Sequence, residues 1–102
     1  MPRPVKCRKV CCLPENNEFY PSGGSGGIVT LTVDEYETIR LIDKENFSQE
    51  KCSWFMQVSR PTVQQIYNSA RRKLAEALVT GAVIRIDGGD YKLCDGKEKQ
   101  CG

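Results

Sequence analysis

The sequence contains no histidine, so it lacks the side chain that serves most often as a general base and as a metal ligand. No apolar run approaches the roughly 20 residues that a membrane-spanning helix needs, and the apolar residues behind the basic start end at Pro14, too soon for a secretory signal. The SGGSGG run leads into a predicted strand, whereas a phosphate-binding loop would open a helix. Paired carboxylates in an apolar setting are also absent. We therefore expect a cytoplasmic protein that is not an enzyme and does not enter a membrane.

The six cysteines lie mostly near the two ends of the chain. Because a secretory signal is missing, reduced thiols or metal ligands are favoured over a secreted disulfide framework. An all-thiolate zinc or iron–sulfur site joining the two tails is one interpretation. Its candidate ligands are Cys7, Cys11, Cys12, Cys94 and Cys101. Their spacing does not match the C-x-x-C knuckle, so inert thiols without a cofactor are the favoured prediction, and metal binding and reversible disulfide sensing are alternatives. Cys52 is expected in the core.

Charge is unevenly distributed, although the net charge is only +2. Residues 1–12 and residues 59–73 each contain four basic side chains and no acidic one. Residues 34–50 contain six acidic and two basic side chains. The distribution of charge, rather than its sum, is therefore the guide to a partner.

The length of 102 residues and the apolar fraction of 39% fit one small domain with a modest core, which is expected to oligomerise. Residues 1–27 predict an extended, basic arm and loop rich in cysteine, proline and glycine. Residues 28–93 predict a mainly α domain with a small β element. Residues 94–102 predict a flexible tail.

Local signals divide the central part of the chain into elements. The β-branched run of residues 28–33 predicts a strand. Thr32 and Glu35 have the spacing of a capping box, which predicts a helix from there to about Lys44. After Gly81, apolar side chains alternate on both sides of the Gly88-Gly89 pair, so residues 82–93 predict a β-hairpin that pairs with the strand at 28–33.

The stretch from Phe47 to Leu78 predicts two helices joined by a tight turn. Ser48 is placed to cap the first, and the turn runs through residues 56–58. Ser59 is placed to cap the second, with Pro61 in its first turn and Gly81 at its end. Its apolar face, at helical spacing, consists of Val63, Ile66, Tyr67, Ala70, Leu74, Ala77 and Leu78. This arrangement is a helix-turn-helix, and the fold class is a three-helix core of this kind with a hairpin and an arm.

The opposite face of the second helix is rich in amide and guanidinium groups. Glutamine and asparagine pair with adenine, arginine pairs with guanine, and a threonine methyl contacts thymine. Hydroxyls, cations and free helix-start amides bind phosphates. The predicted DNA-binding residues are Ser59, Arg60, Thr62, Gln64, Gln65, Asn68, Arg71, Arg72 and Lys73. The competing interpretation is a solvated face without a ligand, and the two capped helices ahead of this face favour DNA.

Several separate segments resemble one family. They are Met1-Pro2-Arg3-Pro4, Lys6-Cys7-Arg8, Phe19 with Pro21, residues 31–43, Gln49-Glu50, Met56 with Val58-Ser59-Arg60 and Thr62, Ser69-Ala70-Arg71-Arg72-Lys73, and residues 84–89. Over about residues 1–93 the chain is similar to domain-of-unknown-function family 134, whose members are described as predicted DNA-binding proteins. The two-helix stretch also resembles region four of sigma factors. That resemblance implies base reading by Arg60, Thr62, Gln64, Gln65 and Asn68, and it adds RNA polymerase as an alternative partner.

Several positions depart from the family pattern, among them Cys52 and Ser53, which replace a pair of alanines. Gln57 stands where the turn usually has glycine, so a non-glycine residue must take a left-handed conformation. Trp54 stands where a polar residue is usual, and it is interpreted either as a dimer or partner contact or as packing under the N-terminal arm.

The functional prediction is a small transcription regulator. It would bind double-stranded DNA as a homodimer or higher oligomer, with two recognition helices about 34 Å apart in successive major grooves. The alternatives are a protein–protein adaptor of the transcription machinery that uses the Trp54 surface and a regulator that responds to thiol chemistry or metal.

Overall fold

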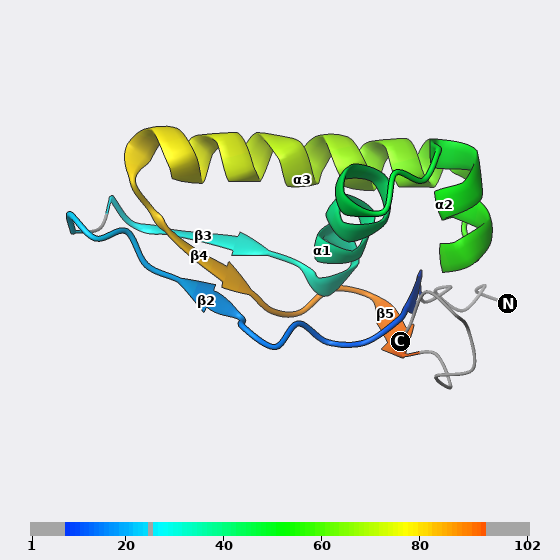
Figure 1. Cartoon of the computed structure of the whole chain (residues 1–102), viewed down its shortest axis with the longest axis horizontal. Helices are drawn as coiled ribbons and strands as arrows, with labels where there is room; N and C mark the ends of the chain where they lie inside the picture. Colours follow the sequence, from blue (N-terminus) through cyan, green and yellow to red (C-terminus); the bar gives the residue numbers. More distant parts are fainter. Residues whose placement is uncertain (1–7, 25, 94–102) are drawn as a thin grey trace, which may run out of the picture.

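The computed structural model describes residues 8–24 and 26–93, which form helices and two small sheets. In chain order the elements are β1 (Arg8–Val10), β2 (Glu18–Phe19), β3 (Ile28–Leu31), α1 (Val33–Ile39), the π-helical turn η1 (Arg40–Lys44), α2 (Gln49–Met56), α3 (Arg60–Thr80), β4 (Val83–Ile86) and β5 (Tyr91–Leu93) (Figure 1). The predicted class, mainly α with a small β component, is confirmed at this level.

Helix α1 begins at the predicted capping box. The Thr32 hydroxyl accepts a hydrogen bond from the Glu35 amide at 3.4 Å, and the Glu35 carboxylate accepts one from the Thr32 amide at 2.9 Å. The helical path reaches Lys44 as predicted, but its last turn is wound as the wider η1, in which the Glu45 amide donates to the Arg40 carbonyl at 2.9 Å.

The boundaries of α2 and α3 follow the predicted caps. The Ser48 hydroxyl accepts from the Lys51 amide at 3.0 Å, and the Ser59 hydroxyl accepts from the Thr62 amide at 3.2 Å. Each bond satisfies a backbone donor that a helix start leaves unpaired. Gly81 ends α3 with φ 70°, the left-handed conformation that glycine adopts without steric cost.

The turn between α2 and α3 contains a strained residue, because Gln57 has φ 60° and ψ 43°. Replacing Gln57 by glycine is expected to raise the free energy of unfolding by about 1 kcal/mol, since the left-handed region disfavours a Cβ atom. Denaturant unfolding measures the change. Asn46→Gly is the control: Asn46 has φ 63°, but asparagine tolerates this region, so its gain is smaller. Destabilisation by Gln57→Gly would contradict the strain argument.

The predicted hairpin of residues 82–93 is wrong. Strand β4 pairs in parallel with β3 and antiparallel with β2, whereas β5 pairs in parallel with β1. Both edges of β4 are thus occupied, so the returning chain has no free edge of β4 to join. The Gly88 carbonyl accepts from the Val33 amide at 3.0 Å, which holds the turn against the start of α1. The predicted pairing of this segment with residues 28–31 is confirmed.

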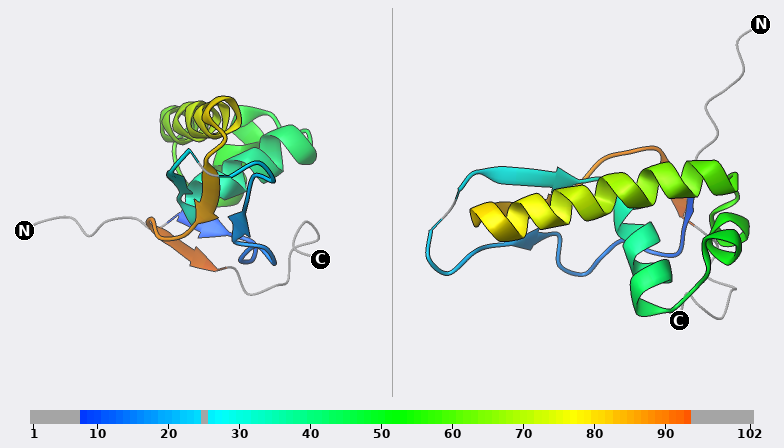
Figure 2. Two further views of the ribbon diagram at one scale, coloured as in Figure 1. Left: turned by 90° about the vertical axis from the view of Figure 1, so that its left-hand side faces the viewer. Right: turned by 90° about the horizontal axis from the view of Figure 1, so that it is seen from above.

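The segment predicted as an extended arm contributes β1 and β2 to the sheets. Val10 in β1 is completely buried, in a cluster with Leu31, Val33, Ala70 and Ile86. This cluster joins the middle of α3 to β1, the β3–β4 sheet and the start of α1. Figure 2 shows α3 lying over that sheet, with α2 at the N-terminal end of α3.

A second cluster joins η1, α2 and the start of α3. Its buried members are Leu41, Phe47, Cys52, Met56 and Val63. Cys52 is therefore a core residue, as predicted, and burial raises the pKa of its thiol to about 12. At neutral pH the side chain is a thiol, so it behaves as a small apolar group.

The predicted apolar face of α3 is correct except at its end. Val63, Ile66, Tyr67, Ala70 and Ala77 are buried, and Leu74 packs against the first cluster. Leu78 was predicted to be buried, but it is 79% exposed. At about 100° per residue Leu78 lies at the edge of this face, on the same side of the helix as the exposed Arg60. The last turns of α3 also extend beyond α1 and α2 (Figure 1), so neither helix covers Leu78.

None of the helices within the described part of the chain is long and apolar enough to cross a membrane.

Candidate nucleic-acid interface

The outward side of α3 carries six exposed polar or basic side chains. They are Arg60, Gln64, Gln65, Asn68, Arg71 and Arg72, and together they are called the polar face here. At about 100° per residue they lie within an arc of about 140° on the helix. No carboxylate lies among them. All six belong to the predicted DNA-binding set, so the structure gathers these residues on one exposed surface.

Ser59 and Thr62, also predicted to bind DNA, take part in the N-terminal cap of α3. Their hydroxyl oxygens are 2.7 Å apart, in addition to the bond from the Thr62 amide to Ser59. Ser59 is exposed, whereas Thr62 is half-buried. Their hydroxyls therefore organise the helix start, and they lie beside the polar face rather than on it.

Lys73 lies on the flank of α3 that faces α1. Its ammonium group donates to the Glu35 carboxylate at 2.8 Å, and the Ser69 hydroxyl donates to the other carboxylate oxygen at 2.5 Å. Burial alone would raise the pKa of Glu35, but the bonds from Lys73, Ser69 and Thr32 outweigh it and hold the pKa below its usual value. Lys73 thus neutralises a buried carboxylate, and the sequence contains no local signal for a pair 38 residues apart.

The orientation of Arg71 is set by an aromatic ring. Its guanidinium lies over the Tyr67 ring, 5.4 Å from the centroid. The Tyr67 hydroxyl donates to the Asp43 carboxylate at 2.7 Å, so the ring is held in place. Burial and then this hydrogen bond raise the pKa of Tyr67. Arg71 remains exposed at the edge of the polar face.

Trp54 lies on α2 and is 70% exposed. The arm does not pack over it among the described residues. Instead, Lys9 of β1 places its ammonium group 5.1 Å from the centroid of the Phe55 ring, which itself packs edge-on against Phe47 at 5.9 Å. Of the two interpretations of Trp54, packing under the described part of the arm is therefore wrong.

The cysteines do not form a metal centre in the described part of the chain, where no group of three histidine, cysteine, aspartate or glutamate side chains can hold a metal ion. Cys11 is buried and disulfide-bonded, whereas Cys12 is exposed and free. A disulfide sulfur is not a thiolate ligand, which disfavours Cys11 in the predicted metal set. Cys7, Cys94 and Cys101 lie outside the described residues.

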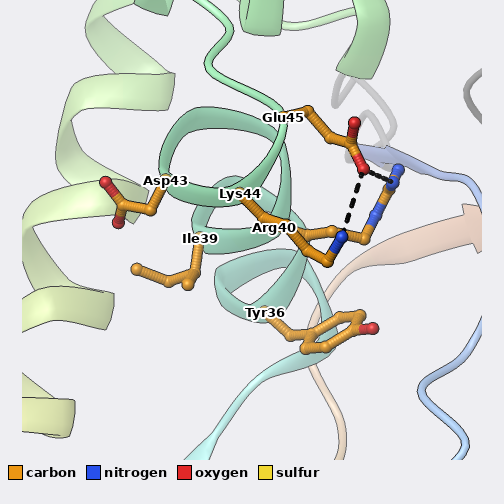
Figure 3. Close-up of a pocket in the computed structure, with 6 residues that line it drawn as sticks. All are labelled: Tyr36, Ile39, Arg40, Asp43, Lys44 and Glu45. Carbon is orange, nitrogen blue, oxygen red and sulfur yellow. Dashed lines mark ion pairs between the residues drawn. The ribbon is translucent and has the colours of Figure 1, made fainter.

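An open groove of about 480 Å³ lies along α1 and η1 (Figure 3). Its lining residues are Tyr36, Ile39, Arg40, Asp43, Lys44 and Glu45. Each charged side chain at its rim has a partner: Glu45 lies 3.8 Å from Arg40 and 4.0 Å from Lys44 (Figure 3), and Asp43 accepts from the Tyr67 hydroxyl at 2.7 Å. This groove therefore offers apolar walls but no unbalanced charge for a ligand.

The chain was compared with known proteins. The family described as "Protein of unknown function DUF134" matches residues 1–94. A UPF0251 protein of Desulfitobacterium hafniense (strain Y51) is 60% identical over 105 residues, covering 100% of this chain and 84% of the relative. A UPF0251 protein of Thermoanaerobacter pseudethanolicus is 50% identical over 98 residues, which cover 93% of this chain and 83% of the relative. A UPF0251 protein of Caldicellulosiruptor bescii is 54% identical over 91 residues, which cover 89% of this chain and 65% of the relative. No solved structure matches. From the family match and the identity to these relatives, the chain belongs to the DUF134 family.

Proposed function

We propose that this protein binds double-stranded DNA sequence-specifically and acts as a small helix-turn-helix transcription regulator. The observation that carries the proposal is the polar face, six exposed amide and guanidinium side chains on one arc of α3. It begins at the capped start of α3, directly after the turn from α2, where a recognition helix presents its N-terminal residues to base edges.

The side chains of the polar face divide by chemistry. Gln64, Gln65 and Asn68 have the paired donor and acceptor that match adenine, and Arg60 has the fork that matches guanine. Each such bidentate contact contributes about 1–3 kcal/mol of discrimination between bases. Arg71 and Arg72 lie one to two turns further along and are assigned to phosphates, which fix the position of the protein on the duplex.

The acidic segment of the sequence does not oppose this binding. Asp34, Glu35 and Glu37 are all more than nine-tenths buried. Glu35 is paired with Lys73, and Glu37 with Arg40. The first three acidic side chains of residues 34–50 therefore point into the protein and are not exposed to a DNA duplex. The guanidinium groups of Arg60 and Arg72 form no ion pair within the described residues, so they remain available to phosphates or bases.

Binding is tested with duplexes selected from a random pool. The affinity for the duplex should fall linearly with salt concentration on logarithmic axes, with a slope of about 0.9 per phosphate contacted.

The variants Arg60→Ala and Gln64→Ala should each lower the affinity for the selected duplex about 5- to 150-fold, which corresponds to 1–3 kcal/mol per contact. Their affinity for unrelated duplexes should change little. Arg72→Ala should weaken all duplexes alike and reduce the salt slope by about one contact. Fluorescence anisotropy measures each affinity.

Lys44→Ala is the matched control, because it also removes one exposed positive charge but on η1 rather than on α3. The Lys44→Ala variant should bind the selected duplex with the same affinity as the wild type. Equal losses for Lys44→Ala and Arg60→Ala would indicate binding by overall charge alone. The absence of duplex binding by the folded protein at low salt would exclude the proposed function.

A second candidate function is an adaptor that binds another protein of the transcription machinery. The observation that favours it is Trp54, an indole 70% exposed on α2, since tryptophan is enriched among the residues that dominate protein interfaces. Trp54→Gln separates the two functions: it should abolish the protein contact of an adaptor and leave the base preference of a DNA-binding protein unchanged.

A further inference from the structure

The C-terminal turns of α3 expose an apolar patch made of Ala75, Leu78 and Val79. Leu78 is 79% exposed and Val79 is 85% exposed, the highest values among the large apolar side chains of the described residues. Ala75 between them is also exposed. The patch continues the outward arc of the polar face along the same helix. Adjacent apolar side chains of this exposure, unlike isolated ones, indicate a contact surface.

The described part of the chain has no segment that covers this patch. Figure 1 shows that α1 and α2 lie toward the N-terminal end of α3 and that its C-terminal turns extend beyond them. The β3–β4 sheet packs under the opposite side of the helix, where Ala70 and Ala77 are buried. The outward side of the last two turns is left without a partner.

We propose that a second copy of this chain covers the patch, with the two α3 helices antiparallel about a two-fold axis that passes the exposed side of the helix at the height of residue 77. In such a pair every contact occurs twice. Residue 75 of one copy lies opposite residue 79 of the other, so the small Ala75 leaves room for the larger Val79. Leu78 packs beside the axis in both copies. The pairing uses only the last two to three turns and leaves the first turns of the polar face open.

Charge complementarity argues for a second copy rather than an unrelated apolar partner. The last turn of α3 contains no basic residue, so the partial negative charge of its C-terminal carbonyls is not balanced within the helix. Arg72 is exposed and lies five residues before the axis, about 7.5 Å along the helix. The helix end at Thr80 lies about 4.5 Å beyond the axis. In the DNA-free dimer, Arg72 of each copy therefore comes within side-chain reach of the helix end of the other; the phosphate contact proposed above applies to the DNA-bound protein.

Sedimentation equilibrium of the full chain, without DNA, tests the interface independently of the proposed function. The wild type should be dimeric at the higher end of a concentration series. The double variant Leu78→Asp/Val79→Asp should be monomeric there, with an unchanged circular dichroism spectrum because both side chains are exposed. Arg72→Glu should weaken the dimer about tenfold, whereas Lys44→Glu, an equal change of charge on η1, should not.

Trp54→Gln removes the other large exposed apolar side chain on a helix and should leave the dimer intact. A wild-type chain that is monomeric throughout the series would overturn the proposal. A dimer that survives the double Asp variant would also overturn it, and its loss in Trp54→Gln would place the contact on α2 instead. Equal weakening by Arg72→Glu and Lys44→Glu would refute the antiparallel arrangement.

Discussion

Replacing Glu37 by alanine is expected to lower the free energy of unfolding by about 3–5 kcal/mol, because it leaves a largely buried guanidinium without its main partner. Glu37 is completely buried. Its two carboxylate oxygens accept from the Arg40 guanidinium at 2.8 and 3.0 Å, and one also accepts from the Cys11 amide at 3.0 Å. The hydrogen bonds to Glu37 raise the pKa of Arg40. Without Glu37 this raise is lost, but a guanidinium still keeps its proton at neutral pH, so Arg40 stays charged in the variant.

The Glu37→Ala substitution should also weaken the connection between β1 and α1, because the Cys11 amide loses its hydrogen-bond acceptor. Denaturant unfolding gives the free energy, and hydrogen exchange at residues 8–12 reports the local opening. Glu45→Ala is the matched control: Glu45 also faces Arg40, at 3.8 Å, but is partly exposed. Removal of such an exposed carboxylate should cost at most about 1 kcal/mol. Equal losses for the two variants would mean that burial of Glu37 contributes nothing.

Replacing Gly89 by alanine is expected to lower the free energy of unfolding by about 2–4 kcal/mol, combining steric overpacking with an unfavourable backbone conformation. Gly89 has φ 96°. An added Cβ would lie 2.5 Å from the Asp34 Oδ1 atom and 2.8 Å from the Thr32 Cβ atom. Asp34 is buried in the first turn of α1 and Thr32 forms the capping box, so neither can move aside without disturbing the start of α1.

Gly88→Ala is the control for Gly89→Ala. Gly88 also has a positive φ, 78°, but an added Cβ there meets no atom within 4 Å. The free energy of unfolding of Gly88→Ala should fall by only about 1 kcal/mol, the cost of the unfavourable backbone conformation. The difference between the two melting curves isolates the steric contact with Asp34 and Thr32. If both variants unfold at the same denaturant concentration, that contact does not limit stability.

The ends of the helices were predictable from the sequence because cap chemistry acts over about three residues. Each cap is a hydroxyl that accepts a hydrogen bond from the backbone amide three residues further along, as at Thr32, Ser48 and Ser59. The left-handed conformation of Gln57 was predicted instead from the family resemblance, in which the turn usually has glycine at this position. The composition of the polar face also follows from helical spacing, since residues on one arc of a helix are set by their order alone.

The sheet and the ion pairs were not predictable in this way. The sequence 82–93 has the local pattern of a hairpin, but β3 and β2 occupy both edges of β4, and β5 pairs with β1 instead. Glu35 fits a capping box, yet it also accepts from Lys73, 38 residues further along, and no local pattern indicates that pairing. Leu78 fits the edge of the apolar stripe but is exposed, because no described segment packs against that side of the last turns.

The sequence by itself determined the helices, their caps, the turn between α2 and α3, and the side chains that share the outward arc of α3. These features depend on residues within one or two helical turns of each other. Only the tertiary structure decided which strand edges were free, which carboxylates were buried and which cations they paired with. Those outcomes depend on contacts between residues distant in the chain, whose distances no local pattern encodes.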